Sequence, residues 1–203
     1  MPRHPRLQYT GAWYHIMNRG AARQKIFLAK SDFELFLEIL ADLCNQYHVE
    51  VHAYCLMNNH YHLLLKINDK NLSDFMQHLS SIYTRKFNKK YKRDGALFRG
   101  RFKSILVDED GYQIYVSRYI HLNPVTAKIV DDPLAYPWSS YRYYIDSSHA
   151  PPWLKTDVIS HQINTSKCFE AYKNYSEYVL DPNISSRLEF YSTKYVDPIY
   201  GSK

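Results

Sequence analysis

The sequence predicts an α+β domain in which two helices cover an antiparallel sheet. Apolar segments in the first half of the chain follow the order strand, helix, strand, strand, helix, strand. Only two residues separate the middle strands, so these strands are expected to pair as an antiparallel hairpin. With 203 residues, the chain is long enough for one domain with a core plus an extension. The order β-α-β-β-α-β is that of the ferredoxin-like arrangement.

The first strand and the first helix are expected before residue 48. Residues 12–18 form a short aromatic-rich segment that is typical of a strand entering a loop. Apolar residues then recur at helical spacing from Phe33 to Cys44. Ser31 and Glu34 match a capping box, so we expect the helix to begin at Ser31.

A β-hairpin is expected over residues 51–67, with Asn58 and Asn59 in the turn because asparagine tolerates positive φ. Successive side chains of a strand point to opposite faces, so His60 and His62 share one face. Two imidazoles one strand repeat apart can bind a single divalent metal ion. The alternative is a pair of half-buried, hydrogen-bonded histidines, and a metal site requires a third ligand from elsewhere in the chain.

Two further helices and one further strand are predicted. A second amphipathic helix runs from Leu72 to about Asn88, and residues 101–107 resemble a strand. A third helix begins at Asp108 or Asp110 and ends at Pro124. Its apolar stripe comprises Tyr112, Tyr115, Val116, Tyr119 and Ile120.

Tyr119 and Asn123 are the candidate functional residues of this third helix. They are four residues apart and therefore share a face. If the helix packs on the histidine side of the sheet, Asn123 can be the third metal ligand and Tyr119 a nucleophile. Tyr112 and Tyr115 have no amide one turn further on and are interpreted as packing residues. On the pattern alone, the whole stripe is also compatible with packing against a core.

Positive charge is concentrated in one segment. The net charge is +6, yet residues 85–103 alone contain nine bases and one acid. The bases alternate with Phe87, Tyr91, Phe98 and Phe102, a mixture suited to binding phosphates and stacking on unpaired bases, although a solvated face is the alternative. The nine bases are Arg85, Lys86, Lys89, Lys90, Lys92, Arg93, Arg99, Arg101 and Lys103.

The remaining composition limits the class of protein. No apolar run approaches the length of a membrane span, and no hydrophobic segment follows the basic start of the chain, so a cytoplasmic protein is expected. The three cysteines are expected to be reduced. Residues 1–130 are predicted to form the main domain. Residues 131–203 form a tyrosine-rich extension with one helix from Cys168 to Val179, and residues 151–152 and those after 181 are interpreted as linker or tail.

Several motifs together resemble the single-tyrosine transposases. The sequence His60-Tyr61-His62 is similar to the His-hydrophobic-His motif of that family, with a tyrosine at the middle position. The segment 118–124 resembles the helix that bears the catalytic tyrosine. The segments 14–20, 57–60, 100–102 and 136–141 resemble the IS200-like branch, in particular its REP-associated tyrosine transposases. The resemblance extends from about residue 12 to residue 144.

The resemblance implies cleavage and rejoining of single-stranded hairpin DNA through a 5′-phosphotyrosine on Tyr119. It implies Mg²⁺ or Mn²⁺ bound by His60, His62 and Asn123, and phosphate contacts from Arg19 and Arg23. Such a protein would act in the cytoplasm at the nucleoid. Two alternatives remain open: a hairpin-binding protein without transposition, and a metal-dependent nuclease that hydrolyses DNA with water. The sequence also leaves open whether the protein is a monomer or a homodimer.

Overall fold

The computed structural model describes residues 7–107, 112–165 and 174–181. Four strands and three helices form its main body: β1 (Trp13–Arg19), α1 (Lys30–Tyr47), β2 (Val49–Met57), β3 (His60–Ile67), α2 (Leu72–Tyr91), β4 (Lys103–Val107) and α3 (Tyr112–Thr126). Three shorter helices follow: α4 (Tyr141–Ile145), α5 (Asp157–Thr165) and α6 (Tyr175–Leu180). Single 3₁₀ turns lie at Ala21–Arg23, Pro133–Ala135 and Ser147–His149. None of the helices in these ranges is long and apolar enough to cross a membrane.

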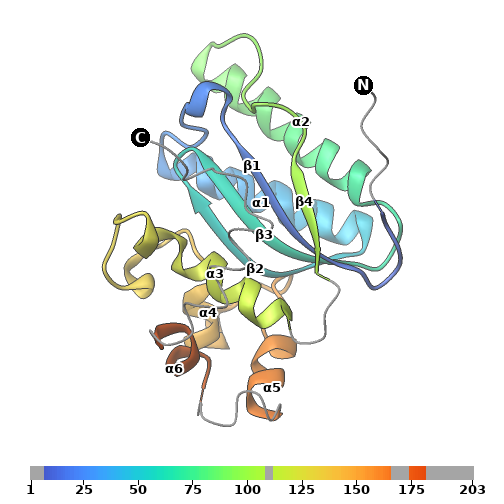
Figure 1. The fold of residues 1–203 in the computed structure, drawn as a ribbon. Helices are drawn as coiled ribbons and strands as arrows, with labels where there is room; N and C mark the ends of the chain where they lie inside the picture. The colour runs from blue at the N-terminus through green and yellow to red at the C-terminus, as the bar shows by residue number, and fades with distance from the viewer. Residues whose placement is uncertain (1–6, 108–111, 166–173, 182–203) are drawn as a thin grey trace.

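The sheet confirms the predicted fold class. Its strands lie in the order β2-β3-β1-β4, and every neighbouring pair is antiparallel. Helices α1 and α2 cover one face, and α3 lies on the opposite side (Figure 1). The side chains of β3 alternate as predicted, because Tyr61, Leu63, Leu65 and Ile67 all belong to the core under α1 and α2. His60 and His62 therefore lie on the side of α3.

Helix α1 begins one residue earlier than predicted and uses a different cap. The carboxylate of Asp32 accepts hydrogen bonds from the backbone N–H groups of Leu28 and Ala29, at 2.8 and 2.9 Å. The predicted capping box is therefore wrong. Ser31 lies inside the helix, and Glu34 pairs with Lys30 instead. Asp32, the third helical residue, takes the role that the pattern gave to Glu34, because its carboxylate reaches back to the N–H of the N-cap residue Ala29.

The turn of the hairpin lies at Asn58 and Asn59 as predicted, but neither residue has a positive φ. The adjacent β1–α1 connection holds the turn instead. The backbone oxygen of Asn58 accepts from the N–H groups of Ile26 and Phe27, and that of Asn59 accepts from Gly20 at 2.8 Å. Tertiary hydrogen bonds thus replace the local turn preference that the sequence suggested.

Helix α3 is packed on both sides. Val116 and Ile120 are buried against the sheet side, whereas the three tyrosines of the predicted stripe are half-buried. The predicted start at Asp108 or Asp110 lies outside the described residues. Pro124 does not end the helix, which continues to Thr126, because a proline in the last turn removes only one hydrogen bond of the ladder.

Residues beyond 130 hold α3 in place through hydrogen bonds. The Arg118 guanidinium donates to backbone oxygens of Val179 and Asp181, at 3.0 and 2.6 Å. The His121 imidazole is hydrogen-bonded to the Tyr175 hydroxyl at 2.6 Å and to the Ser140 hydroxyl at 2.7 Å. These contacts fix the position of α3 along and around its axis.

The buried histidine among these contacts should make the stability of the fold sensitive to acid. Burial lowers the pKa of His121 to about 3, from an ordinary value of 6.5. Between these values the unfolded chain binds the extra proton, so the free energy of unfolding should fall as pH drops below about 6.5, by up to about 1.4 kcal/mol per pH unit. Urea unfolding of His121→Gln between pH 7 and pH 5 should show a correspondingly shallower fall. His161→Gln, at an exposed histidine, is the control; an unchanged slope in His121→Gln would contradict this assignment.

The extension also covers the outer edge of β2. The N–H of Leu56 donates to the oxygen of Trp138 at 2.9 Å, and the N–H of Lys155 donates to Val51 at 2.8 Å. Residues 151–152 are thus part of a segment that packs on the sheet rather than a linker. Residues 168–173 of the helix predicted from Cys168 to Val179, and the tail predicted after residue 181, lie outside the described residues. Asn174 is extended and caps α6, which begins at the next residue. Helices α4 and α5 were not predicted.

Candidate active site

The structure brings His60, His62 and Tyr119 together. The two imidazoles come from β3, with ring centroids 5.1 Å apart. Tyr119 reaches them from α3, and its ring lies edge-on to that of His62 with centroids 5.6 Å apart. The candidate nucleophile and the candidate metal ligands thus come from opposite walls of one site, as the predicted docking of the third helix requires.

Burial keeps these imidazoles neutral. It lowers the pKa of His60 to about 4 and that of His62 well below the ordinary value, the latter with further repulsion from neighbouring histidines. A neutral imidazole has one nitrogen with a free lone pair, which is the form that binds a metal. The two histidines are therefore in the protonation state that a metal site needs.

Asn59 determines which nitrogen of His60 carries the proton. The amide oxygen Oδ1 of Asn59 lies 2.7 Å from Nδ1 of His60 and can only accept, so Nδ1 must be the protonated nitrogen. The amide nitrogen of Asn59 donates to the backbone oxygen of Arg23 at 3.5 Å, which supports this orientation of the amide. Nε2 of His60 is then the nitrogen able to bind a metal.

His15 of β1 plays the corresponding part for His62, and sequence reasoning missed it. Its Nε2 lies 2.9 Å from Nδ1 of His62, and both side chains are fully buried. Nε2 of His62 is buried and makes no hydrogen bond to the residues that the structure describes. An unsatisfied buried polar atom costs about 1–3 kcal/mol, a cost that a bound cation would remove. The signal was the alternation of β1, which places His15 on the same sheet face as His62.

Asn123 lies on the same helix face as Tyr119, as predicted, and is almost fully buried. Its amide nitrogen donates to the backbone oxygen of Tyr119 at 2.8 Å. The amide oxygen, the atom that would bind a metal, is not used in that bond. Across residues 7–107, 112–165 and 174–181, no three or more His, Cys, Asp or Glu side chains form a metal cluster. Within those ranges, the amide oxygen of Asn123 is the candidate for a third ligand.

Tyr119 differs from the other tyrosines of α3 in its surroundings. Burial raises the pKa of its phenol to about 12, with a smaller opposing effect from Asn123. Its ring contacts those of His15 and His62, both with centroids 5.6 Å away. Tyr115 instead contacts the rings of Tyr112 and Tyr178. Of the three tyrosines of α3, Tyr119 is therefore the one that lies beside the imidazoles.

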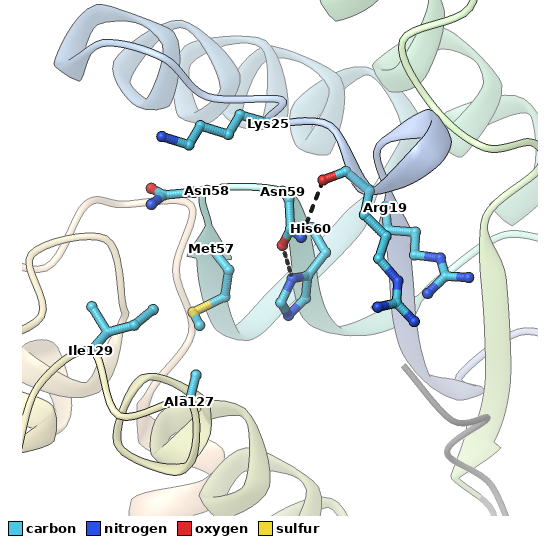
Figure 2. A pocket seen from close by; sticks show the side chains of 9 residues that line it. Arg19, Lys25, Met57, Asn58, Asn59, His60, Ala127 and Ile129 are labelled. Atoms are coloured by element: carbon cyan, nitrogen blue, oxygen red, sulfur yellow. Dashed lines mark hydrogen bonds between the residues drawn. The ribbon is translucent and has the colours of Figure 1, made fainter. Parts of the chain in front are cut away.

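A pocket of about 360 Å³ adjoins His60 at the turn of the hairpin. Figure 2 shows Lys25 above it and Arg19 to its right, with Met57, Ala127 and Ile129 below. Asn58, Asn59, His60 and Arg23 complete the lining. The predicted phosphate ligands Arg19 and Arg23 thus lie beside the candidate metal site.

The predicted basic segment is divided over several elements. Four of its bases lie on α2: Arg85, Lys86, Lys89 and Lys90. This helix packs on the face of the sheet opposite the histidines. Lys92 and Arg93 follow this helix, Arg99 and Arg101 precede β4, and Lys103 begins it. Gln24 joins the segment to the first loop, because its side chain bonds the Arg93 guanidinium and donates to the backbone oxygen of Leu97.

Two parts of the predicted DNA-binding segment have structural roles. Lys90 donates to the buried carboxylate of Asp32 at 2.6 Å, which ties α2 to the start of α1. Phe87, Phe98 and Phe102 are buried, with exposed fractions of 1%, 7% and 6%. These three rings belong to the core, so the prediction that they stack on unpaired bases is wrong. Phe87 reaches the core from α2, and Phe98 and Phe102 reach it from the segment before β4.

Comparison with known proteins gives a family for this arrangement. A family model described as "Transposase IS200 like" matches residues 8–123, which include His60, His62, Tyr119 and Asn123. A protein of Haemophilus influenzae (strain ATCC 51907 / DSM 11121 / KW20 / Rd) that is assigned as a REP-associated tyrosine transposase is 31% identical over 110 residues. That alignment covers 48% of this chain and 62% of the relative, so the chain spans somewhat less than two thirds of that relative's length.

Two solved structures are also similar. One is a REP-associated tyrosine transposase bound to a REP hairpin, with 16% identity and a TM-score of 0.61 over 78% of this chain and 93% of that one. The other, a protein from Deinococcus radiodurans assigned as a transposase, has 18% identity and a TM-score of 0.42 over 59% of this chain and 95% of that one. The first likeness confirms the fold. Because the family match extends over more than half of the sequence, the chain belongs to the IS200-like transposase family.

Proposed function

We propose that this protein cleaves and rejoins single-stranded hairpin DNA through a covalent link to Tyr119. The observation that carries the proposal is the packing of the Tyr119 ring against His62, at 5.6 Å between ring centroids, on a helix held from both sides. This position supports Tyr119 as the nucleophile over Tyr112 and Tyr115, whose rings contact one another and, for Tyr115, that of Tyr178. The proposal also rests on family membership and on the solved relative that is bound to a REP hairpin.

The side chains present fit a divalent cation, Mg²⁺ or Mn²⁺. The ligands would be Nε2 of His60, Nε2 of His62 and Oδ1 of Asn123. Two imidazoles and an amide leave room for water and phosphate oxygens, unlike a closed structural zinc site. The unsatisfied Nε2 of His62 is the feature of this structure that such an ion would explain. When bound, the ion would neutralise charge on the scissile phosphate.

The chemistry of the protein itself is carried by Tyr119. Its phenol must lose a proton, and burial opposes that loss by raising its pKa to about 12. The phenolate oxygen then forms a bond to phosphorus while the bond from phosphorus to the 3′ oxygen breaks, and that oxygen takes up a proton. A second 3′-hydroxyl reverses the step and releases the tyrosine, so rejoining needs no ATP.

The test is incubation with a labelled single-stranded hairpin oligonucleotide and Mn²⁺, followed by a denaturing gel. The expected result is a labelled protein–DNA adduct that is absent with EDTA. Cleaved DNA without an adduct would favour the hydrolytic nuclease, and binding without cleavage would favour a hairpin-binding protein. Either result would overturn strand transfer. A strand-transfer enzyme of this kind would work on chromosomal DNA, at the nucleoid in the cytoplasm.

A positioning role for His15 predicts an effect on metal affinity. His15→Leu removes the acceptor that holds the proton on Nδ1 of His62, so Mn²⁺ affinity should fall about 10–100-fold. His15→Gln, which keeps an accepting oxygen, should retain most of the affinity. Calorimetric titration of Mn²⁺ measures both, and thermal unfolding of the metal-free variants controls for general damage. Equal affinity for wild type and His15→Leu would remove His15 from the site.

The exposed bases of α2 and its end should contribute to DNA affinity through phosphate contacts. Lys86, Lys89 and Lys92 are exposed. Changing all three to Gln should reduce the salt slope of single-stranded DNA affinity by up to about 2, at roughly 0.7 per phosphate contact. Fluorescence anisotropy at several salt concentrations measures this slope, with a double change of Lys30 and Lys70 as the control. An unchanged slope would make this segment a solvated face.

A further inference from the structure

The pocket beside His60 has the features of a nucleotide site. Its cavity of about 360 Å³ lies at the lower end of the range for ligand pockets, roughly 300–1,000 Å³. A cavity of this size admits one nucleotide and not a double helix. His60 forms part of the wall, so a strand whose scissile phosphate lay at His60 and His62 would have its next nucleotide at this opening (Figure 2).

The charged side of the pocket fits a phosphate. Arg19 is half-buried, and Arg23 and Lys25 are exposed. None of these three side chains forms an ion pair with an acidic group in the described part of the chain. Basic side chains without an acidic partner are available for a phosphate, which a guanidinium can contact through two hydrogen bonds.

Hydrogen bonds anchor the loop that carries Arg23 and Lys25. Gly20 is required, because a Cβ there would lie 2.0 Å from the backbone oxygen of Gln24. Ala22 and Arg23 have φ values of 50° and 61°, which L-residues adopt at a cost. The side chain of Gln24 donates to the oxygen of Leu97 at 2.8 Å and anchors the loop. A site held in this way loses little entropy when a ligand binds.

The opposite wall fits the flat face of a base. It consists of Met57, Ala127 and Ile129. Met57 is buried at the end of β2, whereas Ile129 is 47% exposed although it is a large apolar residue. A nucleobase on this wall would cover Ile129 while its phosphate met the basic side. Methionine adapts to ligands of different shape because its side chain is unbranched and polarizable.

From these features we infer that the pocket binds one unpaired nucleotide adjoining the scissile phosphate, its phosphate toward Arg19 and Arg23 and its base against Met57 and Ile129. The inference deepens the proposed function and rests on it for the location of the scissile phosphate. The pocket itself does not include Tyr119, so its binding of a nucleotide can be measured without cleavage.

The test is an NMR titration of the ¹⁵N-labelled protein with deoxynucleoside monophosphates in EDTA. The probes are the 5′- and 3′-monophosphates of deoxyadenosine and thymidine, with deoxyribose 5-phosphate and inorganic phosphate as references. We expect shifts of the amides of Arg23, Asn58 and Ile129, and an affinity at least about fivefold above that for deoxyribose 5-phosphate. Equal affinities would reduce the pocket to a phosphate site and overturn the inference, as would the absence of shifts in these amides.

Variants separate this inference from the proposed function. Ile129→Asp should lower nucleotide affinity at least about tenfold, whereas Leu134→Asp, at a residue 45% exposed and outside the pocket, should not change it. Tyr119→Phe should bind nucleotides as wild type does. Nucleotide binding without adduct formation would overturn the strand-transfer proposal but support the pocket assignment. An adduct formed by a protein without a preference for the base would overturn the pocket and leave strand transfer.

Discussion

Tyr119→Phe should fold, bind hairpin DNA and form no covalent adduct. The change removes one hydroxyl and leaves the ring between His15 and His62, so the packing of α3 is kept. No other oxygen of α3 has the same surroundings. Loss of a nucleophile can lower a rate by about 10⁶-fold, so adduct should fall below detection. A denaturing gel with a labelled hairpin and Mn²⁺ measures the adduct.

Tyr112→Phe and Tyr115→Phe are the matched controls, because both remove a phenol from the same helix. Tyr115 contacts Tyr178 rather than the imidazoles, and both variants should form adduct as wild type does. A persistent adduct in Tyr119→Phe would assign the nucleophile to another residue. Loss of adduct in all three variants would indicate damage to the helix rather than a chemical role for Tyr119.

His62→Gln should lose metal-dependent cleavage and retain hairpin binding. His62 is fully buried, so a glutamine, which roughly preserves volume, tests its ligand role better than an alanine, which would leave a cavity. Loss of a direct ligand should cost more than the roughly 10–100-fold expected of a supporting residue. Mn²⁺ titration by calorimetry and cleavage on a gel measure binding and chemistry separately.

His60→Gln should behave in the same way, because both imidazoles are proposed to bind one ion. His161→Ala, at an exposed histidine of α5, is the control for loss of a histidine as such. Retention of cleavage by both His60→Gln and His62→Gln would contradict the assignment of these histidines as metal ligands. Retention by only one of them would reduce the protein ligands to the other histidine and Asn123.

The sequence was sufficient for the sheet and for the shared face of His60 and His62, because strand alternation is a local rule. It was sufficient for the pairing of Tyr119 with Asn123, because helix spacing is also local. Local rules do not show on which face of the sheet α3 packs, so the sequence analysis could only assume that it packs on the histidine side. The contacts that determine this packing join residues far apart in the sequence: Arg118 and its partner in the backbone of α6 are about 60 residues apart.

His15 shows why the rest of the site was missed. Its contact with His62 joins β1 to β3, and the register of this pair is a tertiary property. Asn59 was interpreted only as a turn residue, although its side chain holds His60. For the basic segment, the sequence predicted too many DNA-binding residues, because charge along the sequence does not show that Lys90 is paired with Asp32.

The backbone pairing of residues 138–155 with β2 bears on how the sheet avoids self-association. Strand β2 is one of the two edges of the sheet, and an open edge offers unpaired N–H and C=O groups to other chains. Residues Trp138, Ser140 and Lys155 occupy these groups along β2. A chain shortened to its first 130 residues would expose this edge together with apolar side chains of α3. Such a fragment should aggregate, so the extension is expected to keep this edge of the sheet from pairing with other chains.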